Sequence, residues 1–392
     1  MNSIDDWAHM LDRFLIERGW ISRVCTSCER AFYAKARNET RTCQRGGCVF
    51  TPLGFLSFSR RRIPLSAFSV AQHLEKAFVG CGYRKREAVC VTETLGKTDL
   101  IGAGVQILEP ILFGDRLPTL GAEFVLQPVV RMQHFGSSEN VEGSSTAFVN
   151  ACSEEVSAPF ERHLEHIDTW LGALSKLGIF MGDVTLLRRV SDSDWGNGLF
   201  QQLELFVMYG GLELGDASYG LIPTRENGTV SVIDVGFGLE RIVWALNKTA
   251  SYFDLLQPLT HGLSLSRHAH DTLRTGALLT LCGVEASNEG VGFQLRKICR
   301  SLAGEGIVGK EVQEVLRHYL GFWGDFLSKK RGIVEAERAF SVEVDRLWQA
   351  KIGDMLKVPR AKSETTEAYA ARLVYTLGVP LEKIRGVLIQ KS

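Results

Sequence analysis

The stretch Ile233-Asp234-Val235-Gly236-Phe237-Gly238-Leu239-Glu240-Arg241 predicts an apolar strand that ends on a carboxylate, followed by a helix that two glycines open. Gly236 and Gly238 let the backbone take a positive φ and let a ligand approach closely. The helix N-terminus favours anionic groups, and Arg241 in its first turn can stack on a base or bind a phosphate. The stretch alone predicts either a nucleotide site or a tight packing turn.

Charge is balanced over the whole chain, with 45 basic and 45 acidic residues, so no global field draws it to nucleic acid. Two segments are locally basic: residues 20–65 hold nine Lys/Arg against two Glu, and residues 295–332 hold eight basic residues against four acidic. Each segment fits an RNA or phosphate footprint, and each also fits a plain solvated face. No apolar run reaches the roughly 18–20 residues that span a bilayer, and the N-terminus lacks a signal-peptide pattern. We therefore expect a cytoplasmic protein with no membrane partner.

Four of the nine cysteines are clustered, at Cys25, Cys28, Cys43 and Cys48, with the spacing C-x2-C-x14-C-x4-C. An odd number of cysteines with one cluster fits reduced thiols and a metal better than a disulfide framework. A tetrahedral zinc site takes four thiolates from two turns of the chain. The spacing therefore predicts structural Zn²⁺, with free cysteines as the alternative.

Periodicity predicts two kinds of structure along the chain. Apolar segments that alternate with period two dominate residues 68–260, which suits an antiparallel sheet with one face packed on helices. Expected strands are 88–92, 123–131, 184–187, 203–209 and 230–234, and expected helices are 4–19, 68–79, 159–177, 262–282, 289–303, 308–328, 333–357 and 365–377. We expect an α+β fold in three parts: a helix and cysteine module (1–66), a sheet domain (67–261) and an all-α domain (262–392).

The order of these segments resembles the alanyl-tRNA synthetases, archaeal type, of the class II aminoacyl-tRNA synthetases. Residues 233–244 resemble motif 3, Gln127–Arg131 resembles the first strand of motif 2, and the four cysteines resemble the family's N-terminal cysteine module. Ser287-Asn288-Glu289-Gly290 and residues 371–380 resemble parts of the helical tRNA-recognition domain. The resemblance stops where the family's editing domain begins, so we expect a form without the editing and C-terminal domains.

The resemblance implies that ATP activates an amino acid, with arginine and Mg²⁺ gathering the anions. Arg131 is expected to bridge the α-phosphate and the carboxylate, although a surface strand end fits it too. Arg241 is expected on the other side of the nucleotide, beside Gly236 and Gly238. Phe148 falls where the family stacks a phenylalanine under adenine, and a core phenylalanine is the alternative.

The resemblance also implies an amino-acid pocket for a small substrate, with L-alanine expected. Asp234 corresponds to the aspartate that holds the α-ammonium, beside Gly236, and Trp195 to a pocket tryptophan. Ser218 stands in the pocket strand, which reads Ala-Ser-Tyr-Gly where the family usually has Val-Phe-Met. Glu204 and Glu213 are candidates for polar or Mg²⁺ contacts.

Two further segments depart from the family. Residues 144–150 replace a His-rich turn and Phe-Glu-Met, so ATP contacts there are expected to pass to Asn150, Glu154 or Glu155. In the helical domain Asn288 matches a minor-groove asparagine with Arg296 nearby, but Tyr375 replaces the carboxylate expected opposite it.

Three functions remain open at this stage. In the first, the aminoacyl-adenylate is captured by a small-molecule nucleophile, such as a nucleoside-like metabolite, and Asn288, Arg296 and Tyr375 are acceptor-binding candidates. In the second, the same residues bind tRNA, and tRNA is charged without an editing domain. In the third, the chain is a catalytically inactive regulatory or tRNA-sensing protein. Tyr375, the remodelled motif 2 and the missing editing domain favour the first.

Overall fold

The computed structural model describes residues 3–49, 53–59, 63–95, 98–112, 121–136, 142–195, 198–224, 228–256, 265–328, 330–377 and 379–389. It forms two compact units, Met1–Val129 with Phe148–Leu255, and Val130–Ala147 with Leu256–Ser392. The segment 130–147 thus clusters with the C-terminal helices, although it lies inside the sheet region of the sequence. The division at residues 66 and 261 stays a prediction.

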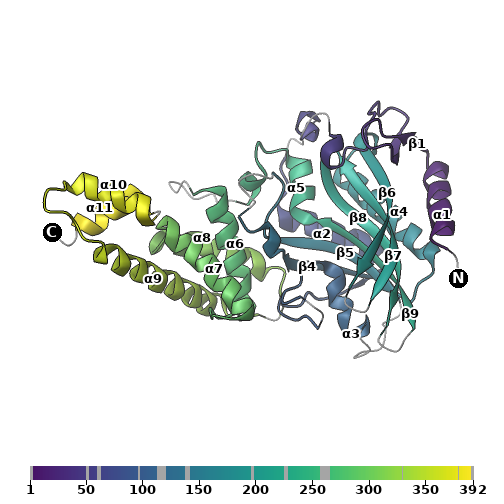
Figure 1. Ribbon diagram of the computed structural model, residues 1–392. Coiled ribbons are helices and arrows are strands. Elements are labelled where there is room, and N and C mark those ends of the chain that lie inside the picture. The colour runs from purple at the N-terminus through teal and green to yellow at the C-terminus, as the bar shows by residue number, and fades with distance from the viewer. Residues whose placement is uncertain are drawn as a thin grey trace. The chain divides into compact units, whose positions relative to one another are not determined.

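The first unit is built on a sheet whose order, in the described residues, is β1-β2-β6-β7-β8-β9-β5-β4-β3 (Figure 1). The strands are β1 (Trp20–Val24), β2 (Ala31–Lys35), β3 (Arg84–Lys85), β4 (Glu123–Val130), β5 (Ala147–Val156), β6 (Val184–Asp194), β7 (Leu199–Tyr209), β8 (Leu212–Pro223) and β9 (Thr229–Gly238). The register is antiparallel from β1 through β2 to β6 and onward to β9 and β5, whereas β3 and β4 pair in parallel over two residues. The expected α+β fold with a large antiparallel sheet is confirmed.

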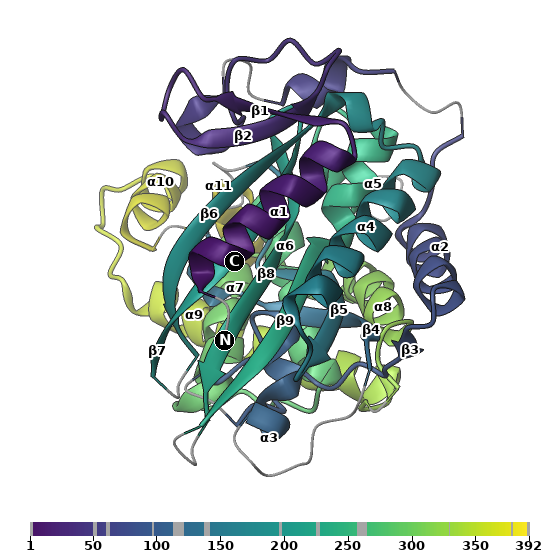
Figure 2. The same ribbon diagram turned by 90° about the vertical axis from the view of Figure 1, so that its right-hand side faces the viewer.

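One face of the sheet is covered by α1 (Ile4–Glu17) and α4 (Phe160–Leu177) (Figure 2). Ser3 caps α1 by accepting a hydrogen bond from the Asp6 amide, which satisfies one of the free N–H groups at the helix start. Trp170 of α4 stacks on Phe237 of β9 with ring centroids 4.3 Å apart, and its Nε1 donates to Ser153 Oγ of β5. Odd-numbered residues of β5 and β9 therefore face α4.

His163 of α4 lies in this packed layer and gives a pH-dependent prediction. Its ring is fully buried beside Phe160 and Tyr219, and its nitrogens have no hydrogen-bond partner within the described residues. Burial, with the neighbouring His166, lowers the pKa of His163 to about 3.

The folded protein thus keeps His163 neutral, whereas the unfolded chain takes up a proton below a pH of about 6.5. The free energy of unfolding is expected to fall as pH drops from about 6.5 toward 3. His163→Phe should remove about 2 kcal/mol of that fall between pH 7 and pH 5. Urea unfolding at both pH values measures this, with the exposed His9→Gln as control; equal pH dependence in wild type and His163→Phe would contradict it.

The second unit is helical: α6 (Arg267–Leu281), α7 (Gly290–Glu305), α8 (Lys310–Gly324), α9 (Ile333–Lys357), α10 (Thr366–Leu377) and α11 (Leu381–Ile389). Helices α6 to α9 pack on one another, and α6 is buried along its whole length from Ala269. At Gly276 a Cβ would lie 2.1 Å from the Phe340 ring, so α6 and α9 approach each other closely.

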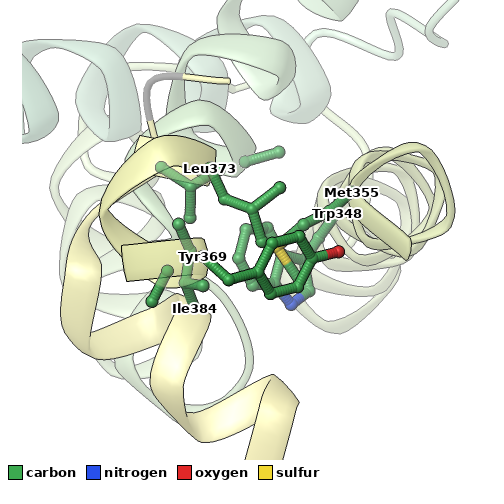
Figure 3. Close-up of a cluster of buried hydrophobic side chains, with 8 residues drawn as sticks. Trp348, Met355, Tyr369, Leu373 and Ile384 are labelled. Atoms are coloured by element: carbon green, nitrogen blue, oxygen red, sulfur yellow. The ribbon is translucent and has the colours of Figure 1, made fainter. Parts of the chain in front are cut away.

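The C-terminal helices α10 and α11 pack on the end of α9. Figure 3 shows their core, in which Tyr369 and Leu373 of α10 and Ile384 of α11 meet Trp348 and Met355 of α9. Within the described residues, no helix is long and apolar enough to cross a bilayer.

The remaining helices of the first unit are α2 (Ala67–Gly80), α3 (Glu109–Leu112) and α5 (Leu239–Asn247). The expected strand at 88–92 is wrong. The backbone of Val89 pairs instead with a side chain, donating to Gln127 Oε1 at 3.0 Å and accepting from Gln127 Nε2 at 2.9 Å, so no strand ladder forms. The sequence reading also missed α11, β1, β2 and β5.

Candidate active site

The face of the sheet opposite α4 carries the residues of motif 3. In β9, Val235 and Phe237 are buried on the α4 side, while Asp234, Gly236 and Gly238 are half-buried. Successive side chains of a strand point to opposite faces, so these three share the other face. We call it the site face.

Neighbouring strands add residues to the site face at the same level. Across β5 and β9, Asn150 pairs with Gly238, Cys152 with Gly236 and Glu154 with Asp234. Across β8, Ser218 pairs with Asp234 and Asp216 with Gly236, and Glu204 of β7 pairs in turn with Ser218. Phe148 follows the same alternation on β5. The structure thus brings together eight expected site residues: Phe148, Asn150, Glu154, Glu204, Ser218, Asp234, Gly236 and Gly238.

Carboxylates are concentrated on this face. Glu154 is 1% exposed, and both its oxygens lack a hydrogen-bond partner within the described residues. Burial and the nearby Asp234 hold the pKa of Glu154 well above its usual range. Burial and the carboxylates of Asp234, Glu213 and Glu204 raise the pKa of Asp216 to about 7. The site face therefore favours a cationic group, because a positive charge would relieve this repulsion.

The glycines of motif 3 act differently from the prediction. Gly236 lies inside β9 and Gly238 is the residue before α5, with φ −70°; neither has a positive φ. Gly236 leaves room for a neighbouring side chain, because a Cβ there would lie 2.9 Å from Asn150 Oδ1. A Cβ on Gly238 would make only an ordinary contact, 3.4 Å from Arg241 Cδ.

Glu240 fixes the start of α5 to β5. Its carboxylate is 1% exposed and accepts from the Val149 amide at 3.1 Å and 3.2 Å. The preceding residue, Phe148, is half-buried and lies on the site face. Motif 3 is therefore tied to the strand that carries the expected adenine-stacking residue, a contact that the sequence reading missed.

Glu213 connects Arg241 with Arg45 of the cysteine module, because both arginines bond to it. Arg241 Nη1 donates to the Glu213 carbonyl oxygen at 3.0 Å, and Arg45 Nε pairs with Glu213 Oε2 at 2.9 Å. The Arg45 guanidinium lies 3.4 Å from the centre of the Phe206 ring, which stands opposite Asp216. The module between Cys43 and Cys48 thus supplies an arginine to this part of the sheet, which sequence spacing did not indicate.

Glu204 and Glu155, two further candidates for polar contacts, lie on opposite faces of the sheet. Glu204 pairs with Arg189 at 3.1 Å. Glu155 lies on the α4 side, where it pairs with His166 and Arg162. The expectation that Glu155 takes over ATP contacts is therefore wrong, because alternation points it away from the site face. Trp195 follows β6 and packs edge-on against Phe200, with centroids 5.2 Å apart.

Arg131 immediately follows β4 and belongs to the second unit. Its amide donates to the Thr146 carbonyl oxygen at 2.8 Å, and its side chain is half-buried. A short 3₁₀ turn, Met132–His134, begins directly after it.

The four clustered cysteines converge as the spacing predicts. All four Sγ atoms lie within 4.8 Å of one another, and Cys28 Sγ and Cys43 Sγ are 3.9 Å apart. A tetrahedron of thiolates around zinc places its sulfurs about 3.8 Å apart, given Zn–S bonds of about 2.3 Å. Glu29 and Gln44, beside the two pairs, take positive φ values of 59° and 63° and turn the chain back. The donor set therefore fits a structural zinc ion.

The acceptor candidates are only partly brought together in the second unit. Arg296 of α7 donates to Asn288 Oδ1 and also pairs with Glu343 of α9 at 3.3 Å. Tyr375 of α10 is 94% exposed. No contact of Tyr375 with the other two is found among the residues that the structure describes.

Comparison with known proteins gives a family resemblance but no family model that matches. The chain is 23% identical over 249 residues to an alanine–tRNA ligase of Thermofilum pendens, covering 59% of this chain and 26% of the ligase. It is 22% identical over 259 residues to that of Methanothrix thermoacetophila, covering 62% and 28%. The chain thus spans about a quarter of the length of these curated relatives.

Among solved structures, a pyrrolysyl tRNA synthetase of Desulfitobacterium hafniense matches with a TM-score of 0.34 and 17% identity, over 50% of this chain and 72% of that one. A prolyl-tRNA synthetase of Giardia lamblia matches with a TM-score of 0.31 and 10% identity, over 77% and 80%. These two likenesses are too low to carry an argument. The chain is thus similar in sequence to alanine–tRNA ligases over about three fifths of its length.

Proposed function

We propose that the protein activates a small amino acid, with L-alanine as the expected substrate, to an aminoacyl-adenylate at the expense of ATP. The observation that carries the proposal is the set of carboxylates around Asp234 on the site face. Glu154 pairs with Asp234 across β5 and β9, and Asp216 of β8 stands opposite Gly236, the next residue of β9 on this face. Carboxylates this close repel one another, so they favour a cationic partner. The α-ammonium of an amino acid supplies that partner.

One aromatic ring, two arginines and two glutamates are proposed to bind ATP and its Mg²⁺. Phe148 offers a half-buried ring for stacking on adenine, which is worth roughly 1–3 kcal/mol per base. Arg131 and Arg241 are proposed to neutralise the α-phosphate and the carboxylate as charge develops between them. Glu204 and Glu213 are the candidates to hold Mg²⁺, which would neutralise the departing pyrophosphate.

Two residues are proposed to restrict the amino-acid side chain. Ser218 lies opposite Asp234 and is 5% exposed, and Trp195 packs on Phe200 at the end of the same face. We propose that these two residues admit the side chain of alanine, glycine or serine. Which of the three is preferred is decided by screening amino acids in pyrophosphate exchange.

For the second step, we propose transfer of the aminoacyl group to a small-molecule nucleophile, such as a nucleoside-like metabolite. Tyr375 stands exposed where the resemblance leads one to expect a carboxylate. Three basic residues of the cysteine module are also engaged within the fold: Arg23 donates to backbone carbonyls of Asn38 and Thr40, Arg37 stacks on Phe180 and Arg45 pairs with Glu213. Fewer cations are thus left for RNA phosphates.

Charging of tRNA is the alternative, and it is supported by the curated relatives, which are alanine–tRNA ligases, and by the paired Asn288 and Arg296. An inactive regulatory or tRNA-sensing role is the second alternative. Retention of Arg131, Asp234 and Arg241 together favours catalysis over that role.

The acceptor prediction separates these functions. We expect labelled alanine and ATP to give little aminoacylation of purified tRNA and measurable transfer to amines or hydroxyls in a panel of small nucleosides. Binding of tRNA, if it occurs, should weaken with a slope of about −0.7 to −0.9 in log K against log salt for each phosphate contacted, whereas a small neutral acceptor shows no such slope. Alanylation of tRNA at the rate of adenylate formation would overturn the small-acceptor proposal and establish the tRNA alternative. Absence of pyrophosphate exchange with every amino acid would overturn activation itself.

A further inference from the structure

The segment that carries Arg131 is held by the C-terminal helices. Residues 130–147 cluster with α6 to α11 rather than with the sheet from which they extend. Thr146 is the central contact: its carbonyl oxygen accepts from the Arg131 amide at 2.8 Å, and its own amide and hydroxyl both donate to Asp271 of α6. One residue thus links Arg131 to a helix more than a hundred positions away in the sequence.

The link is buried and polar. Thr146 and Asp271 are both fully buried, and the two bonds to the carboxyl group measure 2.8 Å and 2.6 Å. Hydrogen bonds strengthen in a low-dielectric interior, and a buried polar group that loses its partner is costly. Asp271 therefore fixes the backbone of Thr146 from two directions.

A second residue of α6 holds the next position of the segment. Arg274 is 1% exposed, and its Nε donates to the Ala147 carbonyl oxygen at 3.2 Å. Its guanidinium stacks on Phe322 and Trp323 of α8, at 4.2 Å and 4.3 Å from the ring centres. The support under the segment is thus itself anchored in the helical core.

The outer part of the segment is also attached to these helices. Phe135 packs edge-on against His268 of α6 at 5.3 Å, and Lys297 of α7 lies 5.2 Å from the Phe135 ring. Glu142 forms an ion pair with Arg267 at the start of α6. Contacts therefore hold the segment on both sides of Thr146.

We propose that Asp271 is a positioning residue for Arg131: through Thr146 it sets the backbone from which the Arg131 guanidinium extends. This inference rests on the proposed function, in which Arg131 binds the reacting anions. This positioning role of α6 does not depend on tRNA. Asp271 and Arg274 of α6 hold the arginine segment in place, so changes to them are expected to affect amino-acid activation even if the acceptor is a small molecule.

The test compares variants of the link with a matched control in amino-acid-dependent pyrophosphate exchange. Thr146→Val removes the hydroxyl donor and Thr146→Ser keeps it, while Asp271→Asn replaces one of the two acceptor oxygens by an amide group. Thr280→Val is the control, because Thr280 is equally buried on α6 but its hydroxyl donates only to carbonyls of its own helix. Thermal melting of each variant confirms that it is folded.

We expect Asp271→Asn and Thr146→Val to lower kcat about 10- to 100-fold with KM for the amino acid within about twofold, because a displaced catalytic group costs rate rather than substrate affinity. Thr146→Ser and Thr280→Val should stay within about twofold of wild type. In an Arg131→Lys background, Asp271→Asn should lower kcat by a smaller factor than it does in wild type, because both changes act on the same guanidinium position.

The outcomes separate the inference from the function on which it rests. Wild-type kcat in folded Thr146→Val and Asp271→Asn, alongside loss of exchange in Arg131→Ala, overturns the positioning role and leaves the proposed function standing. Full exchange in Arg131→Ala overturns the assignment of Arg131, and the positioning role with it. If Asp271→Asn does not fold, the pair Thr146→Ser and Thr146→Val decides the question.

Discussion

Asp234→Asn is expected to lower kcat/KM for amino-acid-dependent pyrophosphate exchange by roughly 10²- to 10⁴-fold. The amide keeps the size of the side chain but removes the charge that is proposed to pair with the α-ammonium. Removing one partner of a desolvated ion pair costs about 3–5 kcal/mol, because the other charge remains buried without compensation. The neighbouring Glu154 should not replace it, since burial and the nearby Asp234 hold the pKa of Glu154 well above its usual range and so disfavour its charged form.

Asp234→Asn should weaken amino-acid binding without lowering the stability of the fold. Fewer carboxylates repel one another on the site face after Asp234→Asn, so the melting temperature is expected to stay the same or rise. The control is Asp192→Asn, because Asp192 is an exposed strand aspartate bonded only to Gln201 in the described structure. Unchanged kinetics in Asp234→Asn, or an equal loss in Asp192→Asn, would mean that the α-ammonium binds elsewhere.

Motif 3 could be predicted from the sequence because its pattern is local. An apolar strand followed by two glycines and an arginine specifies β9 and α5 with few alternatives. The four cysteines were predictable for the same reason, since a short spacing in each pair determines which sulfurs can meet. The expectation of a positive φ at these glycines was wrong: neither Gly236 nor Gly238 takes one, and Gly236 instead leaves space beside Asn150, a contact that depends on the pairing of β5 with β9.

The carboxylate cluster could not be predicted because it depends on register. Glu154 and Glu155 are indistinguishable as neighbours in the sequence, yet one pairs opposite Asp234 and the other bonds to His166 on the α4 side. The contact between Thr146 and Asp271 joins residues far apart in the chain. The same holds for the failed strand at 88–92, where the Gln127 side chain competes with a ladder partner that no local pattern reveals.

The second large effect concerns the cysteine module. We expect the purified protein to hold one zinc ion per chain at Cys25, Cys28, Cys43 and Cys48, and removal of the metal to unfold the module. Structural zinc in comparable peptides contributes apparent binding free energies of about 10–16 kcal/mol at neutral pH, most of which is folding free energy. β2 pairs with β6 over only three residues in the described structure, and Cys25 and Cys43 belong to the buried cluster that packs the hairpin on Leu187 and Phe206, so the thiols are part of what holds β1 and β2 in place.

Loss of zinc should therefore be seen first as faster amide hydrogen exchange in β1 and β2, with β7 and β9 still protected. Activity should fall as well, because Arg45 would leave Phe206 and Glu213, the residue that also accepts a hydrogen bond from Arg241. Metal analysis and hydrogen exchange of Cys43→Ser measure both effects. Cys81→Ser is the control, since Cys81 is exposed and outside the cluster, and it should keep a full zinc content. A wild-type protein that contains no zinc, or a Cys43→Ser variant with full zinc and unchanged exchange in β1 and β2, would show that the four thiols hold no structural metal.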